Sequence, residues 1–172
     1  EPEAHDTAEL TRILRSFAGG ETVATWLQQH PSAGVLRVEA EANMAVGGVP
    51  WGPFAAAQHP AFAGEHARRF AARSHRTVVA ADDAPAAPAE PGRAEARGAG
   101  TIVIGRDLHR SAAARAAIDE LRAAEEPVLV VEMGWPAHPD APHLGGYADL
   151  ATFGSSALAG AALLELLEGS FA

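Results

Sequence analysis

The sequence predicts an α/β protein in which helices cover both faces of a mainly parallel sheet of roughly five or six strands, giving a three-layer sandwich. Residues 101–105 (TIVIG) and 127–133 (PVLVVEM) are short apolar runs typical of buried strands, and a helix is expected to begin between them at Ser111. A strand, a helix and a second strand in this order form a right-handed unit whose strands are parallel neighbours. The 172 residues suffice for one such domain, but not for an eight-fold barrel of typical size.

The first part of the chain, residues 1–30, is expected to be a helical lead-in to the sandwich. Asp6 and Glu9 have the spacing of a capping box, and apolar residues then recur at helical intervals until the glycine pair at 19–20. A second, shorter helix is expected before the His-Pro pair at 30–31. The first strand should follow at residues 35–40.

The middle of the chain changes composition twice. Residues 42–53 contain so many glycines and prolines that we expect an ordered loop without regular structure, with Trp51 in its middle. A helix at 62–72 and a second strand at 77–81 should follow. Residues 82–100 are almost wholly Ala, Pro, Glu, Arg and Gly, which cannot bury enough apolar area to offset the entropy of ordering, so a flexible loop is predicted there.

The C-terminal part is expected to close the sandwich. A last strand at 150–153 precedes a leucine-rich helix capped by Ser155 or Ser156. We therefore expect a single domain over residues 1–172, with the α/β sandwich spanning 35–169.

Composition excludes several classes of function. All 13 basic residues are arginine and the net charge is -9, which argues against a nucleic-acid partner. No apolar run approaches the roughly 18 to 20 residues of a membrane span, so a soluble protein is expected, with a cytoplasmic location favoured and no membrane partner. The absence of cysteine removes disulfides and thiolate chemistry, and no phosphate-binding glycine motif occurs. We expect no cofactor. The opening Glu1-Pro2, without methionine, suggests that upstream sequence is missing.

The first candidate site follows the TIVIG strand. The loop after this strand carries positive and negative side chains and an imidazole, on Arg106, Asp107, His109 and Arg110. Ligands of parallel sheets usually bind at the edge where such strands end. These side chains could contact a ligand, or they could cap the following helix and pair in solvent. Asp107 and His109 could also form a proton-transfer dyad.

The second candidate site follows the next strand. Glu132 and Trp135 join a carboxylate to an indole, a combination that suits sugars, whose C–H faces stack on aromatic rings. The alternative is that Trp135 closes the core, and the same alternative holds for Trp51. The segment that follows carries a third group of side chains, of types that can ligate a metal. The prolines between them prevent a regular helix or strand that would point these side chains toward one another, so no metal site is expected. This group is His138, Asp140 and His143.

The order of the motifs resembles the C-terminal domain of family 3 glycoside hydrolases, and most closely the β-N-acetylglucosaminidase branch. TIVIGRDLHR, PVLVVEMGWP and YADLATFG occur in the same order as in that group, and the upstream NMAVGGVPWGP is similar to the loop after its first strand. The resemblance covers roughly residues 35–169. It implies a flavodoxin-like sandwich.

The resemblance implies a parent enzyme whose barrel, absent from this chain, carries the catalytic aspartate and forms a covalent glycosyl intermediate. An Asp-x-His pair in that barrel transfers the proton, and Asp107-Leu108-His109 shares the spacing but falls in the wrong domain. Other branches place the acid/base glutamate in the C-terminal domain, where Glu132 is the best-placed carboxylate but matches no motif. No catalytic residue is therefore assigned, and Glu132 is kept only as a hypothesis.

The expected function is that of an accessory domain that packs on a glycosidase barrel and contributes side chains to the rim of its sugar site. The alternatives are a free-standing carbohydrate or small-molecule binding module, and a purely structural interaction domain. The residues expected to face the barrel or the sugar are Arg106, Asp107, His109, Arg110, Glu132 and Trp135.

Overall fold

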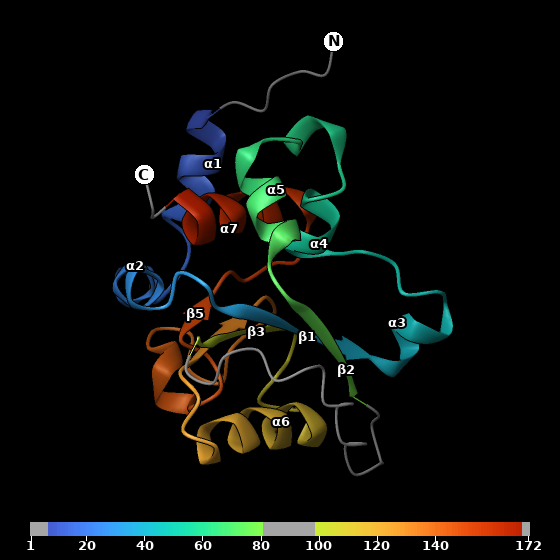
Figure 1. Cartoon of the computed structure of the whole chain (residues 1–172), viewed down its shortest axis with the longest axis vertical. Coiled ribbons are helices and arrows are strands. Elements are labelled where there is room, and N and C mark those ends of the chain that lie inside the picture. Colours follow the sequence, from blue (N-terminus) through green and yellow to red (C-terminus); the bar gives the residue numbers. More distant parts are fainter. Residues whose placement is uncertain (1–6, 81–98, 170–172) are drawn as a thin grey trace.

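The computed structural model describes residues 7–80 and 99–169, and it is an α/β protein with one five-stranded, all-parallel sheet (Figure 1). Helices cover both faces of this sheet, so the predicted flavodoxin-like three-layer sandwich is confirmed. The expected cap at Asp6 and most of the expected loop at 82–100 lie outside the described residues.

The strands lie in the order β2-β1-β3-β4-β5. From β1 the chain moves outward to β2, returns across β1 to β3, and then continues in the opposite direction through β4 and β5. The direction of winding therefore reverses between β1 and β3, which is where sheets of this kind bind their ligands. The strands span Gly34–Ala40 (β1), His75–Ala80 (β2), Thr101–Gly105 (β3), Val128–Glu132 (β4) and Leu150–Ala151 (β5).

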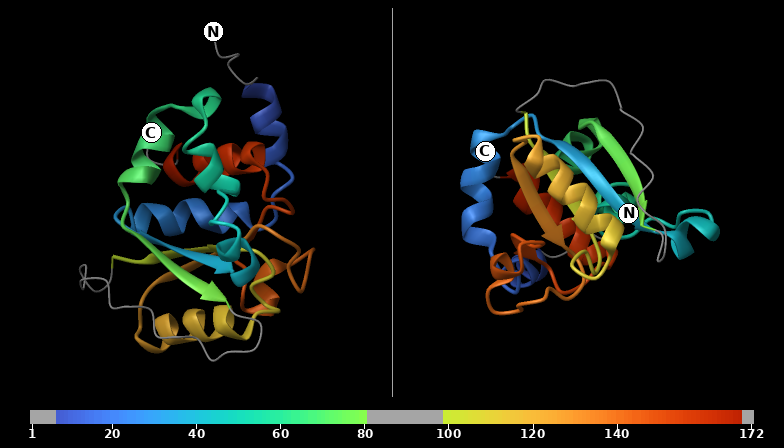
Figure 2. Two further views of the ribbon diagram at one scale, coloured as in Figure 1. Left: turned by 90° about the vertical axis from the view of Figure 1, so that its right-hand side faces the viewer. Right: turned by 90° about the horizontal axis from the view of Figure 1, so that it is seen from below.

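The two faces of the sheet are covered unequally. Helix α6 (Ala112–Ala123) lies on one face, while α1, α2, α4, α5 and α7 lie on the other (Figures 1 and 2). Helix α3 (Glu41–Ala45) projects from the end of β1. The helices of the crowded face span Thr7–Leu14 (α1), Gly20–Gln29 (α2), Gly52–Ala56 (α4), Glu65–Ala72 (α5) and Ala157–Gly169 (α7).

Each face has its own apolar core. On the α6 face, Val103 and Val130 of the sheet pack with Leu108 and Ile118. On the opposite face, Ile102, Ile104 and Val131 pack with side chains from α2, α4, α5 and α7, including Leu163. Neighbouring residues of one strand thus enter different cores, as the two-residue period of a strand requires.

Four local expectations were wrong. The region 42–53 is not wholly irregular, because α3 and α4 form at its two ends and Pro53 supplies a preset φ in the first turn of α4. The helix expected at 62–72 begins only at Glu65, after a separate 3₁₀ turn. Strand β5 has two residues rather than four, and Phe153 with φ 55 turns the chain out of the extended conformation. Helix α1 ends at Leu14, before the glycine pair.

A close approach between α7 and α4 fixes the position of α4. A Cβ built on Gly160 of α7 would lie 2.1 Å from the carbonyl carbon and oxygen of Gly52. The backbone N–H of Gly52 donates to the carbonyl oxygen of Ser155 at 2.8 Å, which ties the start of α4 to the segment before α7. Helix α4 in turn places Trp51, the residue before it, over the end of β1.

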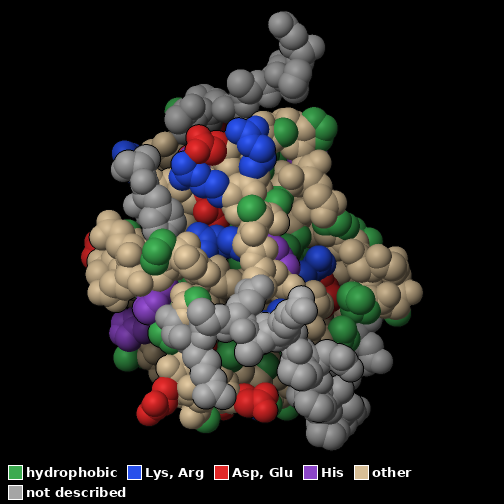
Figure 3. Space-filling model, in the orientation of Figure 1, with side chains coloured by type: hydrophobic (Ala, Val, Ile, Leu, Met, Phe, Trp, Pro, Cys, Tyr) green, Lys and Arg blue, Asp and Glu red, His purple; other side chains and the backbone are tan. Residues whose placement is uncertain are grey.

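Charges on the face drawn in Figure 3 are mixed, with basic and acidic side chains close together near α5. Arg69 pairs with Glu65 within α5, and Arg73 pairs with Glu168 of α7 at 2.6 Å. Among the described residues, no helix has the length and apolar character needed to cross a membrane.

Candidate functional site at the carboxyl edge of the sheet

Three loops meet where β1, β3 and β4 end. Parallel pairing in register places the end of β3 beside those of both its neighbours, since Arg37 aligns with Ile104 and Gly105 with Glu132. The structure therefore places all six predicted residues at one edge of the sheet, since Arg106, Asp107, His109 and Arg110 follow β3 and Glu132 and Trp135 lie at and after the end of β4.

Glu39, at the end of β1, is a buried carboxylate that the sequence analysis missed. Its oxygens accept hydrogen bonds from Trp51 Nε1 at 2.9 and 3.1 Å, and one of them lies 3.7 Å from Arg106 Nη2. Arg37, two residues earlier on the same face of the strand, forms an ion pair with Glu39. Burial raises the pKa of Glu39, but the hydrogen bonds from Trp51 and Asn43 and the charge of Arg37 outweigh it and hold the pKa below its ordinary value.

Trp51 contacts both guanidinium groups through its ring and the carboxylate through its N–H. The guanidinium carbon of Arg106 lies 4.7 Å from the centre of the Trp51 ring, and that of Arg37 lies 5.5 Å from it. Arg37 also lies 4.6 Å from the centre of the Phe54 ring. Cation–π contacts of this kind attract both guanidinium groups to the aromatic rings. The predicted core role of Trp51 is confirmed, because this residue is 7% exposed.

Glu132, at the end of β4, is fully buried and bound entirely by backbone donors. Its oxygens accept from the N–H groups of Asp107 at 2.8 Å, Leu108 at 2.7 Å and Gly134 at 2.5 Å. Burial raises the pKa of Glu132 above its ordinary value, although the three hydrogen bonds oppose the shift. In this arrangement the carboxylate joins the loop after β3 to the loop after β4. Proton transfer to a bound sugar would require it to leave these donors.

The backbone of the loop after β3 directs Arg106 and Asp107 to opposite sides. Asp107 has φ 53, a left-handed conformation that is uncommon for residues other than glycine. A Cβ built on Gly134 would lie 3.2 Å from the Asp107 nitrogen and 3.5 Å from its Oδ1, so the Asp107 carboxylate lies toward β4. Arg106 instead lies toward β1, over Trp51.

His109 and Arg110 take no part in the cluster around Trp51. In the described part of the chain, no hydrogen bond joins the side chains of Asp107 and His109, and the buried Nδ1 of His109 has no partner. The His109 carbonyl accepts from Arg115 at 2.7 Å, and Arg110 is exposed. Helix α6 is capped by Ser111, whose Oγ accepts from Ala114 N at 3.1 Å, and not by the side chain of Asp107.

Trp135 is 61% exposed, so the alternative interpretation, that it closes the core, is wrong. Its ring meets that of Phe153 edge to face, with 5.1 Å between centroids. The left-handed φ of 55 at Phe153, directly after β5, brings this second ring to the same edge of the sheet. An exposed indole beside a carboxylate-bearing loop is compatible with stacking on a sugar.

The side chains between β4 and β5 that are of metal-ligating type do not gather in one place. Asp140 and His143 border a hollow of about 790 Å³ that is also lined by Arg15, directly after α1, and by Glu21 of α2. Within residues 7–80 and 99–169, no group of three or more His, Asp or Glu side chains could hold a metal ion.

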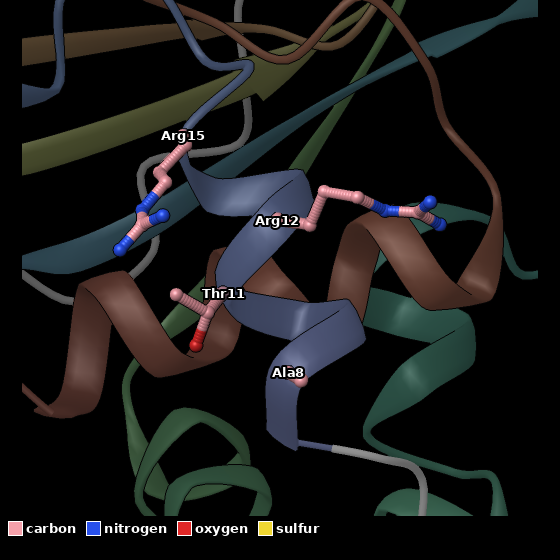
Figure 4. A pocket seen from close by; sticks show the side chains of 4 residues that line it. All are labelled: Ala8, Thr11, Arg12 and Arg15. Carbon is pink, nitrogen blue, oxygen red and sulfur yellow. The ribbon is translucent and has the colours of Figure 1, made fainter.

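A second hollow, of about 430 Å³, is lined, among the described residues, by α1 and by Arg15 directly after it. Figure 4 shows Arg12 and Arg15, which line it with Ala8 and Thr11, pointing in different directions from the helix. Arg12 lies 3.6 Å from Glu9. These side chains do not converge on a common point, so we do not assign a site there.

The sequence contains a pattern from which the buried pairing of Glu39 could have been predicted. The strand GVLRVEA alternates two charged residues with apolar ones at its carboxyl end, which places Arg37 and Glu39 on one face of an otherwise apolar strand. A strand buried on both faces has no solvent for such charges, so they must pair with each other or with a neighbouring element.

Comparison of the chain with family models, with curated proteins and with solved structures found no match.

Proposed function

We propose that this chain is an accessory α/β domain of a family 3 glycoside hydrolase, and that the parent enzyme is a retaining β-N-acetylglucosaminidase. The catalytic barrel would be a partner domain or chain, and the carboxyl edge of the sheet would face it. The proposal rests on the resemblance of residues 35–169 to that family. It also rests on the position of the resembling motifs, which lie in loops at one edge of the sheet.

The exposure of Trp135 beside this edge is the observation that carries the proposal. The loop between β1 and α4 also exposes apolar side chains, since Met44, Val46 and Val49 are 44%, 69% and 55% exposed. Large apolar side chains exposed in segments that follow the strands are typical of surfaces that bind a partner or a ligand. A barrel seated here would cover them.

The chemistry of the edge suits a supporting role. Trp135 offers a ring on which the C–H face of a sugar can stack, and the Asp107 carboxylate can accept hydrogen bonds from hydroxyl groups. Glu132 holds both loops in register by its three backbone hydrogen bonds. Covalent chemistry at the anomeric carbon would belong to the barrel aspartate.

The test compares hydrolysis of a chromogenic β-N-acetylglucosaminide by this chain and by a version extended upstream to its native start. We expect activity only in the longer protein. In that protein, Trp135→Ala should raise KM or lower kcat/KM by roughly tenfold, as expected for loss of one stacked ring. Leu144→Ala, which truncates a 67% exposed side chain farther along the connection from β4 to β5, is the matched control. Hydrolysis by the 172 residues alone would overturn the proposal.

A free-standing carbohydrate-binding module is the second candidate, and the exposure of Trp135 favours it as well. It predicts that the isolated chain binds N,N′-diacetylchitobiose with a saturable change in tryptophan fluorescence that Trp135→Ala removes. A purely structural domain predicts no such change, together with tight association with a separately produced barrel.

A further inference from the structure

The cluster around Trp51 contains more hydrogen-bond donors than acceptors. Two guanidinium groups, each with five N–H donors, face the single carboxylate of Glu39. That carboxylate already accepts from Trp51 Nε1 and from the N–H of Ala40. Arg37 Nε and Nη2 are buried and make no hydrogen bond of good geometry with the described residues, although Nη2 is ion-paired with Glu39. One negative and two positive charges leave the cluster with a net charge of +1.

Arg106 is the part of this cluster that a ligand can reach. Its side chain is 37% exposed, whereas those of Arg37 and Glu39 are 18% and 0% exposed. The Trp51 ring at 4.7 Å and the Glu39 carboxylate at 3.7 Å hold its guanidinium group in place. A guanidinium group fixed in this way loses little conformational entropy when it binds a planar or tetrahedral anion through two parallel hydrogen bonds.

The position of the cluster in the fold also favours a ligand-binding site. Glu39 is the second-to-last residue of β1 and Arg106 follows β3, so the cluster lies where the winding of the sheet reverses. Crevices at this position are the usual ligand sites of open α/β sheets. The competing carboxylate of Asp107 lies on the other side of the loop, toward Gly134.

We propose that Arg106, held by Trp51 and Glu39 and backed by the charge of Arg37, forms a binding site for an oxyanion group of a small ligand. A carboxylate and a phosphate monoester share the required chemistry. This site goes beyond the proposed accessory role, because it needs no barrel and no glycosidase activity.

The experiment uses the ¹⁵N-labelled 172-residue chain, titrated with sodium phosphate and, in a separate series, with sodium acetate. Sodium chloride keeps the ionic strength constant, and the readout is the indole Nε1–H signal of Trp51, assigned by its loss in Trp51→Phe. We expect a saturable shift with Kd on the order of 1–20 mM, typical of a single fixed guanidinium group. Tighter binding of phosphate would identify a phosphate group as the ligand, and equal or tighter binding of acetate would identify a carboxylate.

The matched pair of variants is Arg106→Gln and Arg110→Gln. Both remove one positive charge from the same loop, but Arg110 is exposed and lies outside the cluster. Arg106→Gln should raise Kd by at least roughly tenfold, and Arg110→Gln by less than about twofold. Arg106→Lys keeps the charge and should still raise Kd several-fold, because an ammonium group lacks the bidentate geometry. Equal effects of the two Gln variants, the same shift with chloride alone, or no saturation in the wild type would overturn the proposal. None of these results bears on whether the extended protein hydrolyses sugars.

Discussion

Two buried carboxylates, Glu39 and Glu132, hold the loop after β3 from its two sides. Glu39 is paired with cations and an indole N–H, and its pKa lies below the ordinary value. Among the described residues, Glu132 is paired with neutral backbone donors, and burial keeps its pKa above the ordinary value. Two chemically identical side chains at equivalent strand ends therefore differ in electrostatics because their partners differ.

Replacement of Glu132 should show how much these backbone bonds stabilise the protein. Glu132→Gln keeps the size of the side chain, but an amide has one acceptor oxygen where the carboxylate has two, so at least one buried N–H loses its partner. We expect the free energy of unfolding to fall by about 1–3 kcal/mol, measured by urea denaturation at pH 7. Glu120→Gln, which removes the same charge from an exposed position on α6, should change it by less than about 0.5 kcal/mol. Equal losses in the two variants would contradict this role of Glu132.

The raised pKa of Glu132 predicts a direction of pH dependence. A carboxyl group whose pKa is raised by folding contributes stability that is fully present below its ordinary pKa of 4.5 and is lost as the pH rises through the raised value. The stability difference between wild type and Glu132→Gln should therefore shrink as the pH rises from 4.5 toward 7. Burial also raises the pKa of Asp149, but this residue is present in both proteins, so its contribution cancels in the stability difference. A difference that grows with pH would mean that folding lowers the pKa of Glu132.

At the scale of elements, the crossing of α7 over α4 determines where Trp51 lies. The crossing has no space for a side chain at Gly160, because the atoms that a Cβ would meet belong to the Gly52 backbone and cannot rotate away. The position of α4, and with it the indole over Glu39, thus depends on a glycine in a helix that carries none of the candidate site residues.

Gly160→Ala is therefore expected to destabilise the protein although alanine favours helix. The overlap at 2.1 Å should cost about 1–3 kcal/mol or more, seen as a fall in Tm of several degrees by circular dichroism. The control is Gly154→Ala, because a Cβ at Gly154 meets nothing within 4 Å. The two variants should also differ at the Trp51 indole signal, which only Gly160→Ala should move. Identical Tm values for the two variants would show that α7 and α4 can separate freely.

At the scale of the whole molecule, the sheet separates two apolar cores that share the same strands. Ile118 of α6 and Leu163 of α7 are both fully buried, one in each core. Adjacent residues of β3 belong to different cores, since Ile102 and Ile104 face α7 while Val103 faces α6. Loss of one core would expose one face of every strand, so the two cores should unfold together.

Ile118→Ala and Leu163→Ala test this coupling. Each should lower the free energy of unfolding by about 2–5 kcal/mol and leave a single transition with an unchanged m value. Fluorescence and far-ultraviolet circular dichroism should report the same midpoint in each variant. A second transition that appears in only one of the variants would show that the two layers unfold independently.

The sequence alone determined the fold class and most of the elements. Residues 101–105 match β3 from end to end, and the helix expected at Ser111 begins directly after that residue, because apolar runs and caps depend on neighbouring residues only. The same reasoning placed Arg106, Asp107, Glu132 and Trp135 at strand ends. It failed where chain geometry depends on distant packing, as in the short helices within 42–53 and the two-residue β5.

Only the tertiary structure decided what each site residue does. Glu132 is followed by Met-Gly-Trp-Pro in the sequence, yet two of its three hydrogen-bond partners are backbone N–H groups about 25 positions earlier in the chain. Trp51 and Trp135 both follow strands, but one lies under two arginines and the other in solvent. Local pattern fixes which face of a strand a side chain takes. Its partners, its burial and its pKa come from elements distant in sequence, which meet only when the sheet is assembled.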